Sequence, residues 1–326
     1  MPDPRRSPVN VLRAVDAFFR PAYPAKRLAA LRILIGGFAT FYSIGVAITM
    51  RRLAHAAPAD FAPTGPVAIL SGPLPPWAFY AVTALTLASS VPFTLGYRYR
   101  ITGPLFAAAF LWTGAYRSSF SMIFHTENLL ALHLVVLAMG DAAAVWSLDA
   151  RRARSADPPP DDARFGWPVR LLSLVTVAAY VLAGVAKLRL RGTAWLSGET
   201  LSYQIAYDNA RKAVLGDTYS PIGGFVVRHT WLMRPLAILA VALELGAPLA
   251  LVGRRAATVW AIVAWGFHAG VLALMAIFFP YPTLGLAFLS LFAPERIIER
   301  ILAWTARRRA PTPHPEDACA ARGVGP

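Results

Sequence analysis

Cysteine is almost absent from this chain of 326 residues, which contains only Cys319. A disulfide within the chain is therefore excluded, and so is a metal site built from cysteine pairs. Charged residues are also scarce: they make up 15% of the sequence, against 56% hydrophobic residues. Because soluble domains carry about 25% charged residues, this composition indicates a membrane protein.

Acidic residues are few as well, 17 against 32 lysines and arginines, which gives a net charge of +15. Such a charge is compatible with a nucleic-acid partner. The basic residues, however, occur in short clusters between long apolar blocks, as the residues that set membrane topology do. We therefore expect no nucleic acid to bind. A cleavable signal peptide is not expected either, because the arginine-rich beginning of the chain lacks a compact apolar core.

Several motifs of enzymes and metal sites are missing from the sequence. It contains no HExxH, no GxSxG and no phosphate-binding glycine loop. The six histidines lie at scattered positions without metal-ligand spacing, so no metal is expected. Any chemistry must then come from the ionisable side chains inside the apolar segments.

Long apolar segments dominate what is present. A helix needs about 20 apolar residues to cross the hydrocarbon core of a bilayer. The predicted fold is an all-α, polytopic membrane helical bundle of about eight transmembrane spans, of which the last is short or re-entrant. The predicted spans cover residues 28–50, 77–95, 101–116, 128–148, 170–190, 231–252, 256–279 and 282–292.

The predicted organisation is a cytoplasmic arm (1–19), a transmembrane domain (20–293) and a carboxy-terminal part (294–326) with an amphipathic helix followed by a polar tail. In the long loop before the sixth span, residues 198–215 are expected to form a helix on the surface. With an even number of spans, most arginine clusters fall on the same side as both termini, as the positive-inside rule requires. We therefore predict a multi-pass protein of the cell inner membrane with a cytoplasmic amino terminus.

Ionisable side chains inside the spans are costly, so each needs a partner or a function. Lys187 near the end of the fifth span, Glu244 in the sixth and His268 in the seventh are the main candidates. Each also has a structural interpretation: Lys187 reaching the interface, Glu244 in an interhelical ion pair, and His268 as a packing donor. Arg32 lies near the start of the first span, where we expect it to reach the headgroups.

One face of the fifth span carries Lys187 together with a tyrosine and a glycine. Tyr180, Gly184 and Lys187 are spaced i, i+4, i+7 and therefore lie on the same side of a helix. That side carries a phenol, a gap that admits another helix or a ligand, and a primary amine near the membrane boundary.

Four segments occur in an order that is characteristic of one family: DAAAVWSLD (141–149), YVLAGVAKLRLRGTAWLSG (180–198), ALELGAPLAL (242–251) and FHAGVLALMAIFFPYPTLGL (267–286). The second resembles a Tyr-x-x-Ala-Gly-x-x-Lys-Leu…Trp-x-x-Gly segment, and the last two resemble a Glu-bearing helix and a Phe-His…Phe-Pro stretch. Together they resemble the vitamin K-dependent gamma-carboxylase family and its bacterial relatives with an HTTM (horizontally transferred transmembrane) domain.

The resemblance implies a membrane enzyme in which a lysine acts as base on a reduced quinone. In that family, oxidation of the reduced quinone by oxygen yields an epoxide and a strong base, which removes a proton from a glutamate side chain before carbon dioxide adds. Lys187 matches the lysine. The other catalytic residues implied are His268, Glu244 and, at the entrance of the fourth span, His125. The residues expected to contact the quinone are Tyr180, Gly184, Trp195 and Phe279.

The chain also departs from the animal carboxylases. The large extracytoplasmic portion that positions the protein substrate does not follow the spans, and Ala186 stands where a second lysine precedes the base. Glutamate carboxylation is therefore not expected, whereas oxidation of a reduced quinone or a similar membrane lipid is. Two other interpretations stay open: a non-enzymatic lipid-binding or scaffold protein, and a small-solute transporter, against which the lack of an internal repeat counts.

Overall fold

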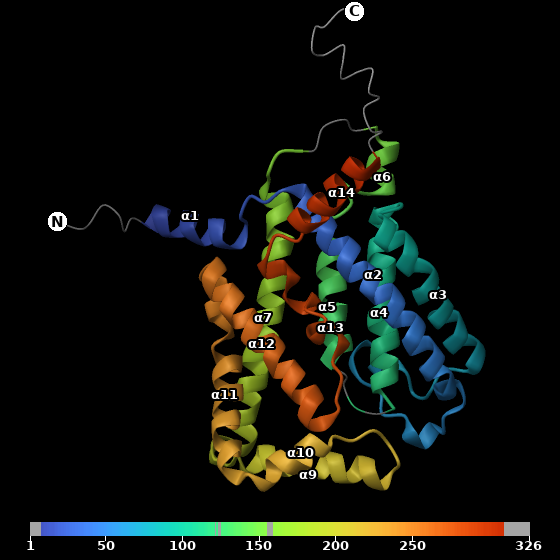
Figure 1. The fold of residues 1–326 in the computed structure, drawn as a ribbon. Coiled ribbons are helices and arrows are strands. Elements are labelled where there is room, and N and C mark those ends of the chain that lie inside the picture. The colour runs from blue at the N-terminus through green and yellow to red at the C-terminus, as the bar shows by residue number, and fades with distance from the viewer. Residues whose placement is uncertain (1–7, 121, 123–124, 155–158, 310–326) are drawn as a thin grey trace, which may run out of the picture.

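The computed structural model describes residues 8–120, 122, 125–154 and 159–309. Every regular element in this part of the chain is helical, and its only β-pairing is an isolated bridge between Tyr23 and Asp162. The predicted all-α fold is therefore confirmed. Long apolar helices make up most of the molecule (Figure 1).

The first four long helices pack as a group in which each contacts the next along the chain. Proline at their starts and glycine at their ends set some of the boundaries: Pro76 begins α3, and Gly96, with a φ of 63°, ends it in the left-handed conformation. Short 3-10 turns fill the connection between α2 and α3. The elements of this group are α2 (Ala25–Met50), η2 (Arg51–His55), η3 (Pro58–Asp60), η4 (Gly65–Ile69), α3 (Pro76–Leu95), α4 (Tyr99–Ser118) and α5 (His125–Met139).

A second group of helices packs around α7, which contacts both α5 and α11 and so joins the two groups. The side chain of Asp162 caps the start of α7 by accepting a hydrogen bond from the Arg164 amide at 2.7 Å. The elements of this group are α7 (Ala163–Arg191), α11 (Met233–Leu245), η6 (Ala247–Leu251), α12 (Arg254–Met275), α13 (Pro280–Thr283) and η7 (Leu286–Leu291).

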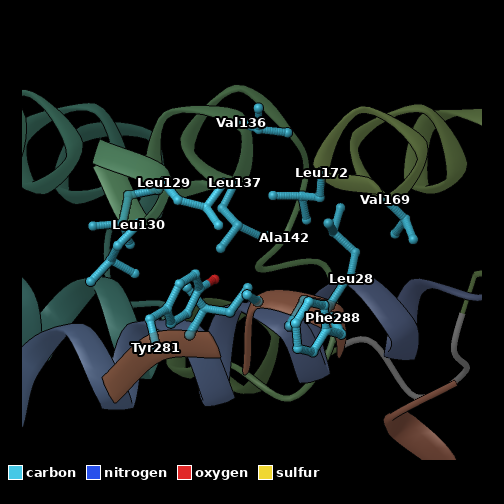
Figure 2. Close-up of a cluster of buried hydrophobic side chains, with 14 of the residues drawn as sticks. Leu28, Leu129, Leu130, Val136, Leu137, Ala142, Val169, Leu172, Tyr281 and Phe288 are labelled. Atoms are coloured by element: carbon cyan, nitrogen blue, oxygen red, sulfur yellow. The ribbon is translucent and has the colours of Figure 1, made fainter. Parts of the chain in front are cut away.

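The core of the bundle lies where the two groups meet. Figure 2 shows side chains from α2, α5, α7, α13 and η7 facing one another there. Its polar members are bonded: the Tyr281 hydroxyl lies 2.6 Å from Nδ1 of His133, and the Thr176 hydroxyl lies 3.1 Å from Nε2 of the same ring. The labelled core residues include Leu28, Leu129, Leu130, Leu137, Val169, Leu172, Tyr281 and Phe288.

Shorter helices lie at the two ends of the bundle (Figure 1). At one end, here called the α9 end, are α8 (Thr193–Leu196), α9 (Glu199–Val214), α10 (Pro221–Arg228) and η5 (Thr230–Leu232). At the other, the α14 end, are α1 (Pro8–Phe19), α6 (Leu148–Arg152) and α14 (Glu295–Arg309). The surface helix predicted over 198–215 corresponds to α9, and the amphipathic helix predicted at the start of the carboxy-terminal part corresponds to α14.

Four helices of the described part are long and apolar enough to cross a membrane: Ala25–His55, Pro76–Leu95, Ala163–Arg191 and Arg254–Met275. A further pair, Pro221–Arg228 and Thr230–Leu245, passes the same test but is bent by 91°. Of the other predicted spans, the third lies in α4, which has 20 residues but does not pass this test, α5 ends at Met139, the sixth is divided at Gly246, and the last consists of α13 and η7. A bundle that crosses a membrane is thus supported, and the number of eight crossings stays a prediction.

The expectation for Arg32 is wrong. Its side chain does not reach the surface but is fully buried, and it donates to the carbonyl of Trp146 at 2.5 Å. The segment after α5 folds over the start of α2, and its Asp149 carboxylate accepts from the amides of Arg98 and Tyr99, both at 2.8 Å. Because this connection covers the end of the helix, a guanidinium near the start of a span is enclosed rather than solvated.

Candidate functional site

The centre of the candidate site is an ion pair between Lys187 of α7 and Glu244 of α11. The two helices approach closely because α7 has a glycine at position 184. A Cβ built there would lie 2.9 Å from Cδ2 of Leu245 and 3.0 Å from Cβ of Glu244. The gap that the sequence predicted on this face is therefore filled by α11 at this level.

Lys187 is held in an apolar and aromatic setting. Its Nζ lies 5.2 Å from the centre of the Trp195 ring and 5.7 Å from that of Phe267, within the range of cation–π attraction. The lysine side chain keeps 20% of its surface exposed, whereas the Glu244 side chain keeps 4%. One carboxylate oxygen of Glu244, Oε2, is buried and has no hydrogen-bond partner among the described residues.

A second polar pair lies two turns earlier on the same face of α7. The Tyr180 hydroxyl is 2.7 Å from Nε2 of His268, which belongs to α12. Aromatic rings surround this pair: Trp260 packs edge-on against Tyr180 with ring centres 4.9 Å apart, and Phe279 lies edge-on to His268 at 5.6 Å. The result is a phenol and an imidazole in contact inside an aromatic wall.

The structure thus brings most of the predicted residues together around α7. Lys187, Glu244 and Trp195 form one group, while Tyr180, His268 and Phe279 form the next. Position 125 begins α5, but the side chain of His125 lies outside the described residues. Among the described residues no three metal-ligating side chains lie together.

Chemically, the arrangement offers both a proton acceptor and a flat apolar wall. A lysine and a carboxylate in contact can exchange a proton, and a neutral amine is a competent general base. The unpartnered Oε2 of Glu244 is a place for a hydrogen-bond donor.

Sequence reasoning missed a second buried carboxylate. Glu127 at the start of α5 forms an ion pair with Arg117 of α4 and accepts from the Tyr42 hydroxyl at 2.9 Å. Glu127 lies in a polar connection of the sequence, where a charged residue is expected to be solvated. The sequence therefore offers no reason to single it out. A pocket of about 340 Å³, its open mouth included, lies beside it. None of the residues predicted to contact a quinone lines this pocket.

Comparison with known proteins identifies the family. A family model described as the HTTM domain matches residues 19–296, which is most of the chain. No curated protein and no solved structure matches this chain. The match agrees with the family resemblance seen in the four ordered segments and with the apolar helical bundle. The chain therefore belongs to the HTTM-domain family.

Proposed function

We propose that this integral membrane protein binds the head of a reduced quinone or a similar lipid beside α7 and that Lys187 removes a proton from its hydroxyl. The observation that carries the proposal is the position of Lys187: its amine contacts Glu244 and lies between the rings of Trp195 and Phe267. This is the residue that matches the base of the carboxylases in the resemblance.

Proton movement would start from the ion pair. Transfer of a proton from the lysine to Glu244 leaves a neutral amine, which accepts the hydroxyl proton of the bound lipid. A bound lipid head would exclude water from the pair and so favour this transfer, against the cation–π attraction of the two rings for the ammonium. The reduced quinone would supply the acidic hydroxyl and the electrons of the reaction, and oxygen would accept these electrons.

Tyr180 and His268 would orient the head of the lipid. Their contact at 2.7 Å fixes both rings, and Trp260 and Phe279 extend the apolar wall beyond them. A polar donor or acceptor placed by two packed rings gives a ligand one orientation, which is what small-molecule sites use for specificity.

We further propose the inner membrane as its location, with both described terminal helices on the cytoplasmic side. The supporting observation is that α1, α6 and α14 lie at the same end of the bundle (Figure 1). These helices and their neighbours are rich in arginine, and cytoplasmic connections carry the excess of basic residues.

The alternative is a lipid-binding or scaffold protein without catalysis. The same ion pair supports it, because a lysine and a glutamate on packed helices also serve as a structural link. In this case Lys187 would contribute to stability, and replacing it would not change how much quinone is retained.

The test is purification in detergent followed by mass spectrometry of the co-purified lipids. We expect a quinone with the wild type and its loss with Lys187→Met, since a hydrogen bond to a charged group contributes about 1.5–3 kcal/mol, or roughly tenfold or more in affinity. Arg189→Met is the matched control, because Arg189 lies on the same helix and is exposed. Absence of quinone from all three preparations would contradict the proposal, and equal retention in all three would favour the scaffold.

A further inference from the structure

A second polar site lies in the first group of helices, away from Lys187. It is the pocket of about 340 Å³ between α2, α3, α4 and α5. Its walls are largely apolar, with Val46, Ala47, Leu87 and Phe110 among the residues that line it. Because this volume includes the open mouth, the enclosed part has room for a water-sized polar group such as a hydroxyl, and anything larger must extend out through the mouth.

Two buried polar atoms in this pocket lack a partner among the described residues. Glu127 keeps 4% of its surface exposed, and its Oε2 makes no hydrogen bond there, although Oε1 is bonded to Tyr42 and Arg117. Ser43 keeps 6% exposed, and its Oγ makes none either. Both residues line the pocket. A buried polar atom without a hydrogen bond is costly, so two that line the same pocket indicate a ligand.

The charges define what kind of ligand is needed. Arg117 already balances the carboxylate of Glu127, so no second cation is required. What remains at Oε2 is the capacity to accept a hydrogen bond, and Ser43 can both donate and accept. The threonines of the pocket have partners: Thr83 donates to the Phe79 carbonyl at 2.9 Å, and the hydroxyls of Thr86 and Thr113 lie 2.9 Å apart, each also within hydrogen-bond distance of a carbonyl of its own helix.

We propose that this pocket binds an amphiphile with a hydroxyl head and an apolar tail. The head donates to Oε2 of Glu127 and accepts from Oγ of Ser43, and the tail lies along Val46 and Leu87 toward the lipid. Exposed apolar side chains on the same helix, Ile44 and Ile48, mark its outer surface as a lipid-facing one. A water molecule would satisfy the same two polar atoms, and competition by the alcohol but not by its ether separates the two occupants.

The test uses a photoreactive analogue of hexadecan-1-ol, with a diazirine in its chain, added to the purified protein in detergent. After irradiation, digestion and mass spectrometry, we expect the label on peptides from α2, α3 or α4. Hexadecan-1-ol should compete with the label, whereas its methyl ether, which cannot donate a hydrogen bond, should compete at least about tenfold less well. Equal competition by both compounds would overturn the proposal.

Substitutions locate the site. Ala47→Phe fills the pocket with an apolar side chain and should reduce labelling of these helices about tenfold. Ile48→Phe is the matched control, because Ile48 is 61% exposed on the same helix, so the substitution should leave labelling unchanged.

Ser43→Ala removes one hydrogen-bond partner of the hydroxyl head. It should reduce labelling about threefold to tenfold, as the loss of one neutral hydrogen bond does. Unchanged labelling in both Ala47→Phe and Ser43→Ala would contradict the site, and a folded elution profile for each variant makes the comparison valid.

Discussion

The ion pair between Lys187 and Glu244 joins α7 to α11 and can serve either proton transfer or stability. Breaking a buried pair leaves the remaining charge without a partner, which is more costly than never having had the pair. Glu244 is the more enclosed member, since its side chain is 4% exposed against 20% for the lysine. Loss of the lysine should therefore harm the protein more than replacement of both residues.

Stability measurements on three variants test this. Lys187→Met should lower the free energy of unfolding by about 2 kcal/mol, less than a fully buried pair would cost because the lysine is partly exposed. The double variant Lys187→Met with Glu244→Leu should recover at least half of the loss. Thermal unfolding in detergent checks both. A double variant that is less stable than Lys187→Met would contradict this account of the pair.

Gly184 provides a second test of how closely α7 and α11 pack. Gly184→Ala places a Cβ within 3.0 Å of Leu245 and Glu244, so it should destabilise by about 1–3 kcal/mol, as overpacking does. Gly270→Ala is the control, because a Cβ at position 270 of α12 meets no atom within 4 Å. It should be neutral or slightly stabilising. Equal midpoints of thermal unfolding for the two variants would mean that the approach of the helices at Gly184 is looser than described.

The sequence predicts which residues share one side of α7, but not what they touch. Spacing alone places Tyr180, Gly184 and Lys187 on one side of α7, because a helix has a fixed period. Pairing with Glu244 and His268 depends on how three helices rotate about their axes, which no local pattern encodes. Arg32 shows the same limit, since its enclosure depends on a connection more than 100 residues away, where Trp146 lies.

At the scale of elements, α9 and α10 hold the end of α12. The last carbonyls of a helix have no partner within it, and here side chains from other helices supply the partners. Asn209 donates to the carbonyl of Leu274 at 2.9 Å and Lys212 to that of Met275 at 2.7 Å. Oδ1 of Asn209 also accepts from the Ser220 amide at 2.6 Å, which ties α9 to the start of α10. The sequence predicts a surface helix here, but not that its polar side chains cap another one.

Asn209→Ala should loosen this end of the molecule. The substitution leaves the Leu274 carbonyl and the Ser220 amide without their partner, each at a cost of about 1–3 kcal/mol. We expect faster amide hydrogen exchange over 199–228, with little change in α2 to α5, which belong to the other group of helices. Gln204→Ala, an exposed position on the same helix, is the control and should exchange like the wild type. Unchanged exchange over 199–228 in Asn209→Ala would show that other contacts hold these helices in place.

At the scale of the whole molecule, the distribution of arginine and the arrangement of the helices agree. The α14 end includes the ion pairs that join α14 to the start of α2, Lys26 to Glu299 at 2.6 Å and Arg27 to Glu295 at 2.9 Å. The Asp149 contacts place the turn between α3 and α4 beside α6 at that end as well. The sequence predicted these basic connections on one side by counting spans, and the fold gathers them at one end (Figure 1).

The orientation itself can be read with single cysteines, because Cys319 is the only one in the chain. In a Cys319→Ser background, Arg300→Cys reports on the α14 end and Gln204→Cys on the α9 end; both positions are exposed. In intact cells with a permeable outer membrane, a membrane-impermeant maleimide should label the cysteine at 204 and reach the one at 300 only after the inner membrane is disrupted. This follows from the positive-inside rule, since the basic end stays in the cytoplasm. The reverse labelling pattern would mean that the protein has the opposite orientation in the membrane. Lys187 would then lie near the cytoplasmic face, because α7 leads into α8 at the α9 end.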